Sequence, residues 1–213
     1  MKLYDFAYSP NCRKVRAVAY ELGIEFESKH IDLLNGEQRS PAYLALNPNG
    51  RVPVLADGDF VLWESTAIMR YLSAKRGGAL VPATPEGHAE LDRWLAWQLA
   101  HLGPAMSKVA FERIVKKLTG QGAPDEAVVA AGSSEFHKLT AILDGALEGR
   151  DYLAGTISLA DFALASHCSL AEACGLDLAP YARVNTWLGR VLRRESMQRA
   201  LSDAHALMRA NAA

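Results

Sequence analysis

A hydroxyl and a thiol stand close together near the N-terminus, in the segment Ser9-Pro10-Asn11-Cys12. The segment follows an apolar-aromatic stretch, residues 2–6, and precedes apolar residues at helical spacing, so it is expected to open a helix. The start of a helix stabilises negative charge, because its backbone N–H groups lack partners and its dipole is positive there. Ser9 could therefore polarise the sulfur of a ligand. The alternative is an ordinary capping serine followed by proline in the first turn.

Cys12 and Tyr8 are alternative candidates for the reactive group at this helix start. The segment resembles the Cys-Pro-x-Cys motif of thioredoxin-like redox proteins, with Ser9 in place of the first cysteine and Cys12 as the second. Loss of the first thiol removes dithiol exchange as a simple mechanism. Tyr8 directly precedes Ser9 and would need to point into the site to act.

A second candidate segment is Arg51-Val52-Pro53, which leads into an expected strand. Proline cannot donate to a β-ladder, so Pro53 suits an edge strand or the start of a strand. A cis Val52–Pro53 bond would turn the Val52 backbone outward, leaving its N–H and C=O free for an extended ligand. An ordinary edge-strand proline is the alternative interpretation.

A third candidate is the Glu64-Ser65 pair, where an expected strand, residues 60–63, gives way to a helix. A carboxylate, a hydroxyl and unpaired helix N–H groups converge there. Such a corner can bind the carboxylate and ammonium of an amino acid together. A capping serine beside a solvated glutamate is the alternative.

The elements that must position these residues change character along the chain. Residues 1–76 show a βαβ pattern, then a loop and a ββα pattern, which predicts a small mixed sheet. Residues 77–86, rich in glycine and proline, are expected to be a linker. Residues 87–213 carry helical periodicity throughout. The predicted fold class is an α/β domain at residues 1–76 followed by an all-α domain at residues 87–213.

Composition excludes several classes of function. The formal net charge is −1, from 23 basic and 24 acidic residues, so no nucleic-acid footprint is indicated. The 3 cysteines favour reduced thiols and a cytoplasmic protein over a disulfide framework. No apolar run is long enough for a transmembrane helix, so no membrane association is expected. The histidines show no metal-ligand spacing, so no metal is expected.

Taken together and in this order, the motifs resemble the glutathione transferase family over essentially the whole chain. Ser9 falls on the activating serine of the theta, phi and tau classes. The resemblance implies a thioredoxin-like domain followed by a helical one, with glutathione as co-substrate. It also implies these glutathione contacts: Gln38 and Arg51 toward the glycyl carboxylate, Val52 and the cis-proline Pro53 at the cysteinyl part, and Glu64 and Ser65 at the γ-glutamyl end.

Three further segments bear on the class within the family. Gln38 replaces a histidine that several classes carry. Ser158 and Asp161 have the spacing of a capping box before an apolar run, similar to the motif that starts the buried core helix of the family. Gly103-Pro104 stands where the theta class carries an arginine, so the sequence departs from that class.

The resemblance implies a transferase that activates the glutathione thiol as a thiolate for attack on a small-molecule electrophile or a peroxide. A role in detoxification and a homodimer are implied with it, the dimer contact being formed by helices 65–76 and 88–102. One alternative is a glutathione-dependent isomerase of the maleylacetoacetate type, although that class carries Ser-Ser-Cys where this chain has Ser9-Pro10-Asn11. A non-catalytic binding module of the same fold is the other.

Overall fold

The computed structural model describes the backbone of residues 1–211 and the side chains of residues 1–203, so the last two residues of the expected helical domain lie outside it. The chain divides into two compact units. Residues 1–80 and the described residues from 193 onward form the first unit, and residues 81–192 form the second. No helix among the described residues is long and apolar enough to cross a membrane.

The first unit is built on a four-stranded mixed sheet with the strand order β2-β1-β3-β4. β1 and β2 are parallel, as the predicted βαβ pattern requires, whereas β3 runs antiparallel to both β1 and β4. With the helical second unit, this arrangement confirms the predicted fold class. The strands are β1 (Lys2–Asp5), β2 (Glu27–His30), β3 (Val54–Asp57) and β4 (Phe60–Trp63).

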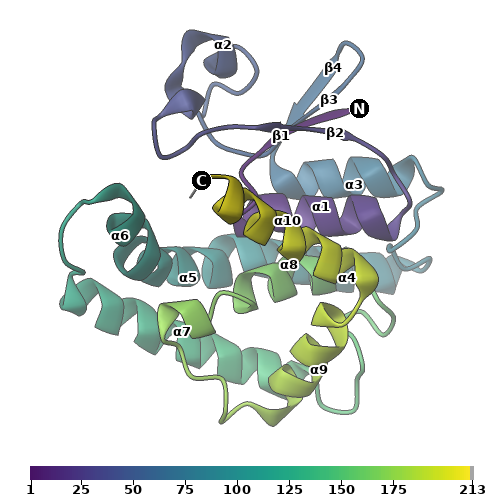
Figure 1. Cartoon of the computed structure of the whole chain (residues 1–213). Coiled ribbons are helices and arrows are strands. Elements are labelled where there is room, and N and C mark those ends of the chain that lie inside the picture. Colours follow the sequence, from purple (N-terminus) through teal and green to yellow (C-terminus); the bar gives the residue numbers. More distant parts are fainter. Residues whose placement is uncertain (212–213) are drawn as a thin grey trace. The chain divides into compact units, whose positions relative to one another are not determined.

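Helices cover the sheet on both faces. α1 (Pro10–Glu21) and α3 (Ser65–Ala74) pack against each other and lie on one face of the sheet (Figure 1). The short helices η1 (Glu37–Arg39) and α2 (Pro41–Leu44) belong to the loop between β2 and β3. A separate apolar cluster forms beside them from Ile31, Tyr43 and Val54, with Tyr4, Leu33, Leu46 and Val52 packed against it.

The hairpin between β3 and β4 has a short loop. Asp57 is paired with Phe60 as the last residue of β3. The loop therefore consists of Gly58 and Asp59. Gly58 has a φ of 61°, a left-handed value that glycine adopts without the steric cost other residues meet.

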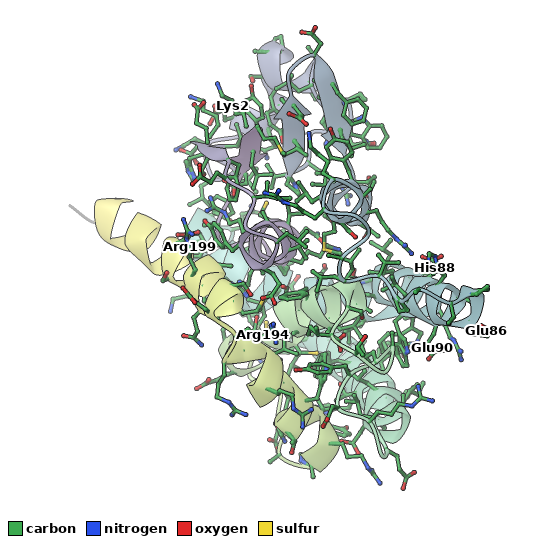
Figure 2. The ribbon with its side chains drawn as sticks, turned by 90° about the vertical axis from the view of Figure 1, so that its right-hand side faces the viewer. Lys2, Glu86, His88, Glu90, Arg194 and Arg199 are labelled. Carbon is green, nitrogen blue, oxygen red and sulfur yellow. The ribbon has the colours of Figure 1, made fainter. Side chains whose placement is uncertain are left out.

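The C-terminal helix α10 (Glu195–Asn211) belongs to the first unit because it packs on α1. The Glu21 carboxylate accepts hydrogen bonds from Arg194 and Ser196, and Arg199 lies over the ring of Tyr20. Figure 2 labels Arg194 and Arg199 along this helix. This grouping differs from the expected division, which assigned all of residues 87–213 to one helical domain.

The second unit is helical and surrounds α8, all ten residues of which are buried. Close packing requires a glycine at one point, since a Cβ atom on Gly132 of α7 would lie 2.8 Å from a methyl group of Val109 on α5. The elements are α4 (Pro85–Trp97), η2 (Gln98–Leu102), α5 (Gly103–Ala110), η3 (Phe111–Val115), α6 (Lys116–Thr119), α7 (Glu126–Ala146), α8 (Leu159–Cys168), η4 (Glu172–Cys174) and α9 (Ala182–Leu192).

The start of α8 carries the expected capping box between Ser158 and Asp161. The buried Asp161 carboxylate does more than cap the helix. It accepts hydrogen bonds from the backbone N–H and hydroxyl of Ser158, the N–H of Leu153 and the indole N–H of Trp187, at 2.8–3.1 Å. Burial raises the pKa of Asp161, and these donors oppose the rise. One side chain therefore ties the preceding loop and α9 to the core helix.

We predict that Asp161→Ala lowers the melting temperature much more than the loss of a helix cap alone. A cap is worth about 0.5–2 kcal/mol. Removal of Asp161 also leaves several buried donors without acceptors, each costing about 1–3 kcal/mol, so the expected total is about 3–5 kcal/mol. For a chain of this size that corresponds to a fall on the order of 10 °C, measurable by circular dichroism.

Asp125→Ala is the matched control. Asp125 caps α7 by accepting the N–H groups of Ala127 and Val128, and these hydrogen bonds are exposed to solvent. Replacement of Asp125 should lower the free energy of unfolding by only the contribution of a helix cap, about 0.5–2 kcal/mol. Equal losses from the two substitutions would show that the additional bonds of Asp161 contribute nothing.

Candidate glutathione site

The strand register brings the three candidate segments to the same end of β1, β3 and β4, which is called the site edge of the sheet below. Val54, the first residue of β3, is paired with Tyr4 near the end of β1 and with Trp63 at the end of β4. The chain that leaves β1 leads to Ser9, the chain that enters β3 carries Val52 and Pro53, and the chain that leaves β4 carries Glu64. The register thus gathers residues that are more than fifty positions apart in the sequence.

Ser9 is half-buried and is the N-cap residue of α1, with an extended backbone at φ −67° and ψ 125°. Its carbonyl oxygen accepts the N–H groups of Cys12 and Arg13 at 3.0 and 2.9 Å. Its hydroxyl makes no capping hydrogen bond. The backbone of Ser9 therefore starts the helix, and the side chain is not used for that purpose.

Cys12 is enclosed in the first turn of α1, with 0% of its surface exposed. The N–H of Phe6 donates to its sulfur at 3.4 Å. Burial raises the pKa of the Cys12 thiol to about 12 and nearby Asp5 adds to the rise, while hydrogen bonds from Phe6 and the Ser9 side chain oppose it. This environment keeps the thiol protonated and out of contact with solvent.

Tyr8 is half-buried, and its ring lies 5.2 Å from that of Phe6, measured between centroids. Removal from water raises the pKa of its phenol, so the hydroxyl remains protonated near neutral pH. Tyr8 follows β1 closely in the chain and stays adjacent to Ser9. Tyr8 therefore packs against Phe6, and this contact by itself indicates no chemical role.

Two buried side chains hold the Arg51–Val52 segment. The hydroxyl of Tyr43 and the side-chain amide of Asn47 both donate to the carbonyl oxygen of Arg51, at 2.9 and 2.7 Å. The Val52–Pro53 peptide bond is cis, as the resemblance implies. Val52 precedes the first paired residue of β3, so its backbone lies outside the ladder.

Gln38 lies on η1 next to the turn that precedes Arg51. Its backbone oxygen would be 3.1 Å from a Cβ atom on Gly50, so the two segments are in close approach. The side-chain oxygen of Gln38 is buried and has no hydrogen-bond partner among the described residues. Arg51 is exposed. The two expected glycyl contacts therefore lie on neighbouring segments, and Gln38 retains hydrogen-bonding capacity.

Glu64 and Ser65 form a sharp corner between β4 and α3. Glu64 is exposed and has a φ of 72°, a left-handed value that is uncommon for a residue with a side chain. Ser65 is the first residue of α3, and its hydroxyl donates to the side-chain oxygen of Asn11 on α1 at 3.4 Å. The first turn of α3 therefore presents its N–H groups beside the start of α1, and both helix ends favour negative charge.

Sequence reasoning missed the residues that support this edge. The side chain of Asn47 is buried and fixes the Arg51 carbonyl. Tyr43 and Asn11 were not singled out. An asparagine directly before Pro48 is a signal of a structured turn, but its long-range partner cannot be read from spacing.

Comparisons with known proteins agree with this geometry. Residues 1–74 match the family description "Glutathione S-transferase, N-terminal domain" and residues 102–195 match "Glutathione S-transferase, C-terminal domain". The chain is 36% identical to Glutathione S-transferase 3 of Zea mays over 95% of this chain and 93% of that protein. It is 33% identical to the probable glutathione S-transferase GSTF2 of Oryza sativa subsp. japonica, covering 95% and 96% of the two chains.

A solved structure of similar length gives the same result. The theta class glutathione S-transferase from Xanthomonas axonopodis pv. citri, solved with glutathione bound, superimposes with a TM-score of 0.87 at 32% identity, over 94% of this chain and 96% of that one. Similarity of this extent covers both units. The chain therefore belongs to the glutathione S-transferase family.

Proposed function

We propose that this chain is an enzyme that binds glutathione along the sheet edge and activates its thiol as a thiolate. The observation that carries the proposal is the register around Val54, which gathers Ser9, Val52 and Glu64 at one edge. The γ-glutamyl end is assigned to Glu64 and Ser65, and the cysteinyl backbone to Val52. The glycyl carboxylate is assigned to Gln38 and Arg51.

The proposed activation needs no general base. A free thiol titrates near ~8.5, so roughly 3% is thiolate at pH 7. A pKa lower by about two units requires about 2.7 kcal/mol of thiolate stabilisation. A hydrogen bond from the Ser9 hydroxyl to the thiolate is worth about 1.5–3 kcal/mol, and the start of α1 adds about 0.3–1 kcal/mol. These two contributions suffice to make the bound thiol nucleophilic.

The thiolate then attacks a small-molecule electrophile or a peroxide, and proximity of the two bound reactants supplies further acceleration. The comparisons favour neither the isomerase nor the non-catalytic module. Retention on immobilised glutathione, followed by turnover of a generic aryl halide, tests the proposal. A protein that is retained without turnover would be a binding module instead.

We further propose a homodimer located in the cytoplasm, with a role in detoxification and no metal or nucleic acid as partner. The edge strand β4 supports the dimer, since Phe60, Val61 and Trp63 are exposed apolar side chains on it, next to α3 in the chain. Exposed apolar side chains gathered on one strand are typical of an interface. Helices 65–76 and 88–102 remain the predicted contact.

We predict a dimeric mass by light scattering at micromolar concentration. Phe60→Glu should shift the protein toward monomer, because a charge would be buried in the interface. Leu118→Glu is the control, since Leu118 is 53% exposed, comparable to the 48% of Phe60, but lies on α6, outside the predicted contact. A monomeric wild type would contradict the prediction.

We predict that Glu64→Ala and Ser65→Ala each weaken glutathione binding more than they slow the reaction of bound glutathione. Both residues are assigned to the end of the ligand remote from sulfur, so the loss is mainly uniform binding. Saturation kinetics should show a raised KM for glutathione and a kcat close to that of the wild type. Glu25→Ala, which removes an exposed carboxylate elsewhere in the unit, should change neither. A large loss of kcat with an unchanged KM for glutathione would show that these residues have a different role.

The ultraviolet absorbance of the glutathione thiolate, measured against pH, distinguishes the roles of Ser9, Cys12 and Tyr8. If Ser9 donates to the thiolate, Ser9→Ala should raise the pKa of bound glutathione by about one to two units, equivalent to about 1.5–3 kcal/mol. Turnover at pH 7 should then fall roughly ten- to a hundred-fold and partly recover at high pH, where the thiolate forms unaided.

Cys12→Ala and Tyr8→Phe complete the series. The enclosed Cys12 thiol supports a packing role, so its replacement should leave the titration of bound glutathione close to that of the wild type. Formation of a mixed disulfide between Cys12 and glutathione would instead indicate thiol transfer. A Ser9→Ala curve that superimposes on the wild type, with a shift in Tyr8→Phe, would move the hydroxyl role to Tyr8.

A further inference from the structure

The carbonyl oxygen of Arg51 has both of its acceptor positions occupied by buried side chains. The hydroxyl of Tyr43 donates to it at 2.9 Å, and the side-chain amide of Asn47 donates to it at 2.7 Å. Each of these two donor residues is only 3% exposed. A carbonyl oxygen has two lone pairs, so two such donors fix its direction, toward α2 and the turn that follows α2.

The direction of this carbonyl also sets the direction of the Val52 N–H, because the two groups belong to one peptide unit. The Val52–Pro53 bond is the single cis bond among the described residues, so the Arg51–Val52 bond is trans. In a planar trans peptide the C=O and the N–H point in opposite directions. The Val52 N–H therefore points away from Tyr43 and Asn47.

The backbone polar groups of Val52 are not used within the described part of the chain. Neither the N–H nor the carbonyl oxygen of this half-buried residue makes a hydrogen bond to any residue that the structure describes. Backbone N–H groups are normally paired within the fold or with water. A backbone N–H whose direction is fixed, and which has no partner in the fold, is available to a ligand.

The two donors are themselves held in place by other contacts. Tyr43 packs in the apolar cluster with Val54, the first residue of β3, and its ring lies edge-on to that of Tyr4 on β1, with 6.5 Å between centroids. The side-chain oxygen of Asn47 accepts the backbone N–H and the side-chain amide of Asn49 at 3.0 and 3.1 Å. The direction of the Arg51 carbonyl is therefore set before any ligand binds.

We propose that Tyr43 and Asn47 are positioning residues for glutathione: they set the direction of the Val52 N–H so that it donates to the backbone of the cysteinyl part. The inference rests on the proposed function, which assigns that part of the ligand to Val52. Without the two donors the Arg51–Val52 peptide unit is free to rotate, and only a fraction of the molecules holds the N–H in the binding direction. The apparent affinity falls by that fraction.

The test measures the binding of S-methylglutathione, which has no free thiol, so activation by Ser9 does not contribute. Its Kd is measured by calorimetry on the full chain. Hydrogen exchange of the Val52 amide is followed by nuclear magnetic resonance, with and without the ligand. The amide of Leu55, a residue of β3 that is paired on both sides, is the internal reference.

The variants remove one donor at a time. Tyr43→Phe removes the hydroxyl and keeps the packed ring, and Asn47→Asp removes the amide donor and keeps an oxygen for Asn49. Tyr71→Phe is the matched control, because the Tyr71 hydroxyl donates at 2.7 Å to Asp57, at the other end of β3. A purely structural role of Tyr43 and Asn47 would lower the melting temperature and leave Kd unchanged.

In the wild type, S-methylglutathione at about 100 times its Kd should slow exchange of the Val52 amide by up to about a hundredfold, because exchange then requires the ligand to leave. Tyr43→Phe should raise Kd by about two- to tenfold, the range that corresponds to the loss of one net hydrogen bond. Asn47→Asp should raise it further, since a carboxylate also repels the Arg51 carbonyl. Tyr71→Phe should bind as the wild type does.

A Val52 amide that is not protected in the saturated wild type would overturn the inference and leave glutathione binding itself supported. Kd values of Tyr43→Phe and Asn47→Asp equal to that of the wild type would overturn it as well, even if both variants melted earlier. Failure of the wild type to bind S-methylglutathione would overturn the proposed function and this inference with it. If Asn47→Asp does not fold, Tyr43→Phe and the exchange of the wild type still decide the question.

Discussion

The pairing of Val54 with Tyr4 on one side and Trp63 on the other is the constraint on which the site depends. β3 is a central strand, and both Val54 and Leu55 are buried, so its register is fixed by the apolar core. A slip of one residue would turn these side chains to the opposite face and move Pro53 by about 3.3 Å along the strand. The pairing of β3 with its two neighbours therefore both stabilises the core and fixes the position of the backbone proposed to bind the ligand.

The same register brings the starts of two helices to one edge. α1 begins after the loop that leaves β1, and α3 begins directly after β4, with the Asn11–Ser65 hydrogen bond between them. Each helix start carries partial positive charge. Deeper in the unit, Arg16 is neutralised by Asp5, and burial raises the pKa of that carboxyl while Arg16 opposes the rise. The two helix starts therefore favour an anionic ligand at this edge.

Local patterns predicted most of the elements but not the contacts that make the site. Ser65–Ala74 and the parallel βαβ unit followed directly from spacing and caps, because these signals are local. The short helices at Glu37–Arg39 and Pro41–Leu44 were missed because they are too short to show periodicity. Packing of α10 on α1 was missed because the ion pair of Glu21 with Arg194 joins residues far apart in the chain.

Burial of polar groups was the least predictable feature. A lysine in an amphipathic helix is expected to face solvent, so nothing in the sequence indicates that Lys14 has no exposed surface. The capping box at Ser158 and Asp161 could be predicted from spacing, whereas the bond from Trp187 could not. Functional and structural roles of such residues depend on partners that only the tertiary structure brings together.

The different burial of Ser9 and Cys12 explains how one helix start supports conjugation rather than thiol exchange. A thiolate at Cys12 would lie at the position where the dipole of α1 stabilises charge, and it would repel a second thiolate on the ligand. Enclosure in the first turn raises the pKa of Cys12 to about 12, so this sulfur stays neutral and leaves the positive helix end to the ligand. Replacement of the first cysteine of the thioredoxin-like motif by Ser9 then supplies a donor that cannot be oxidised to a disulfide. Under the proposed function, the sulfur that becomes negative at this edge is that of glutathione, and its attack can form a stable thioether with an electrophile.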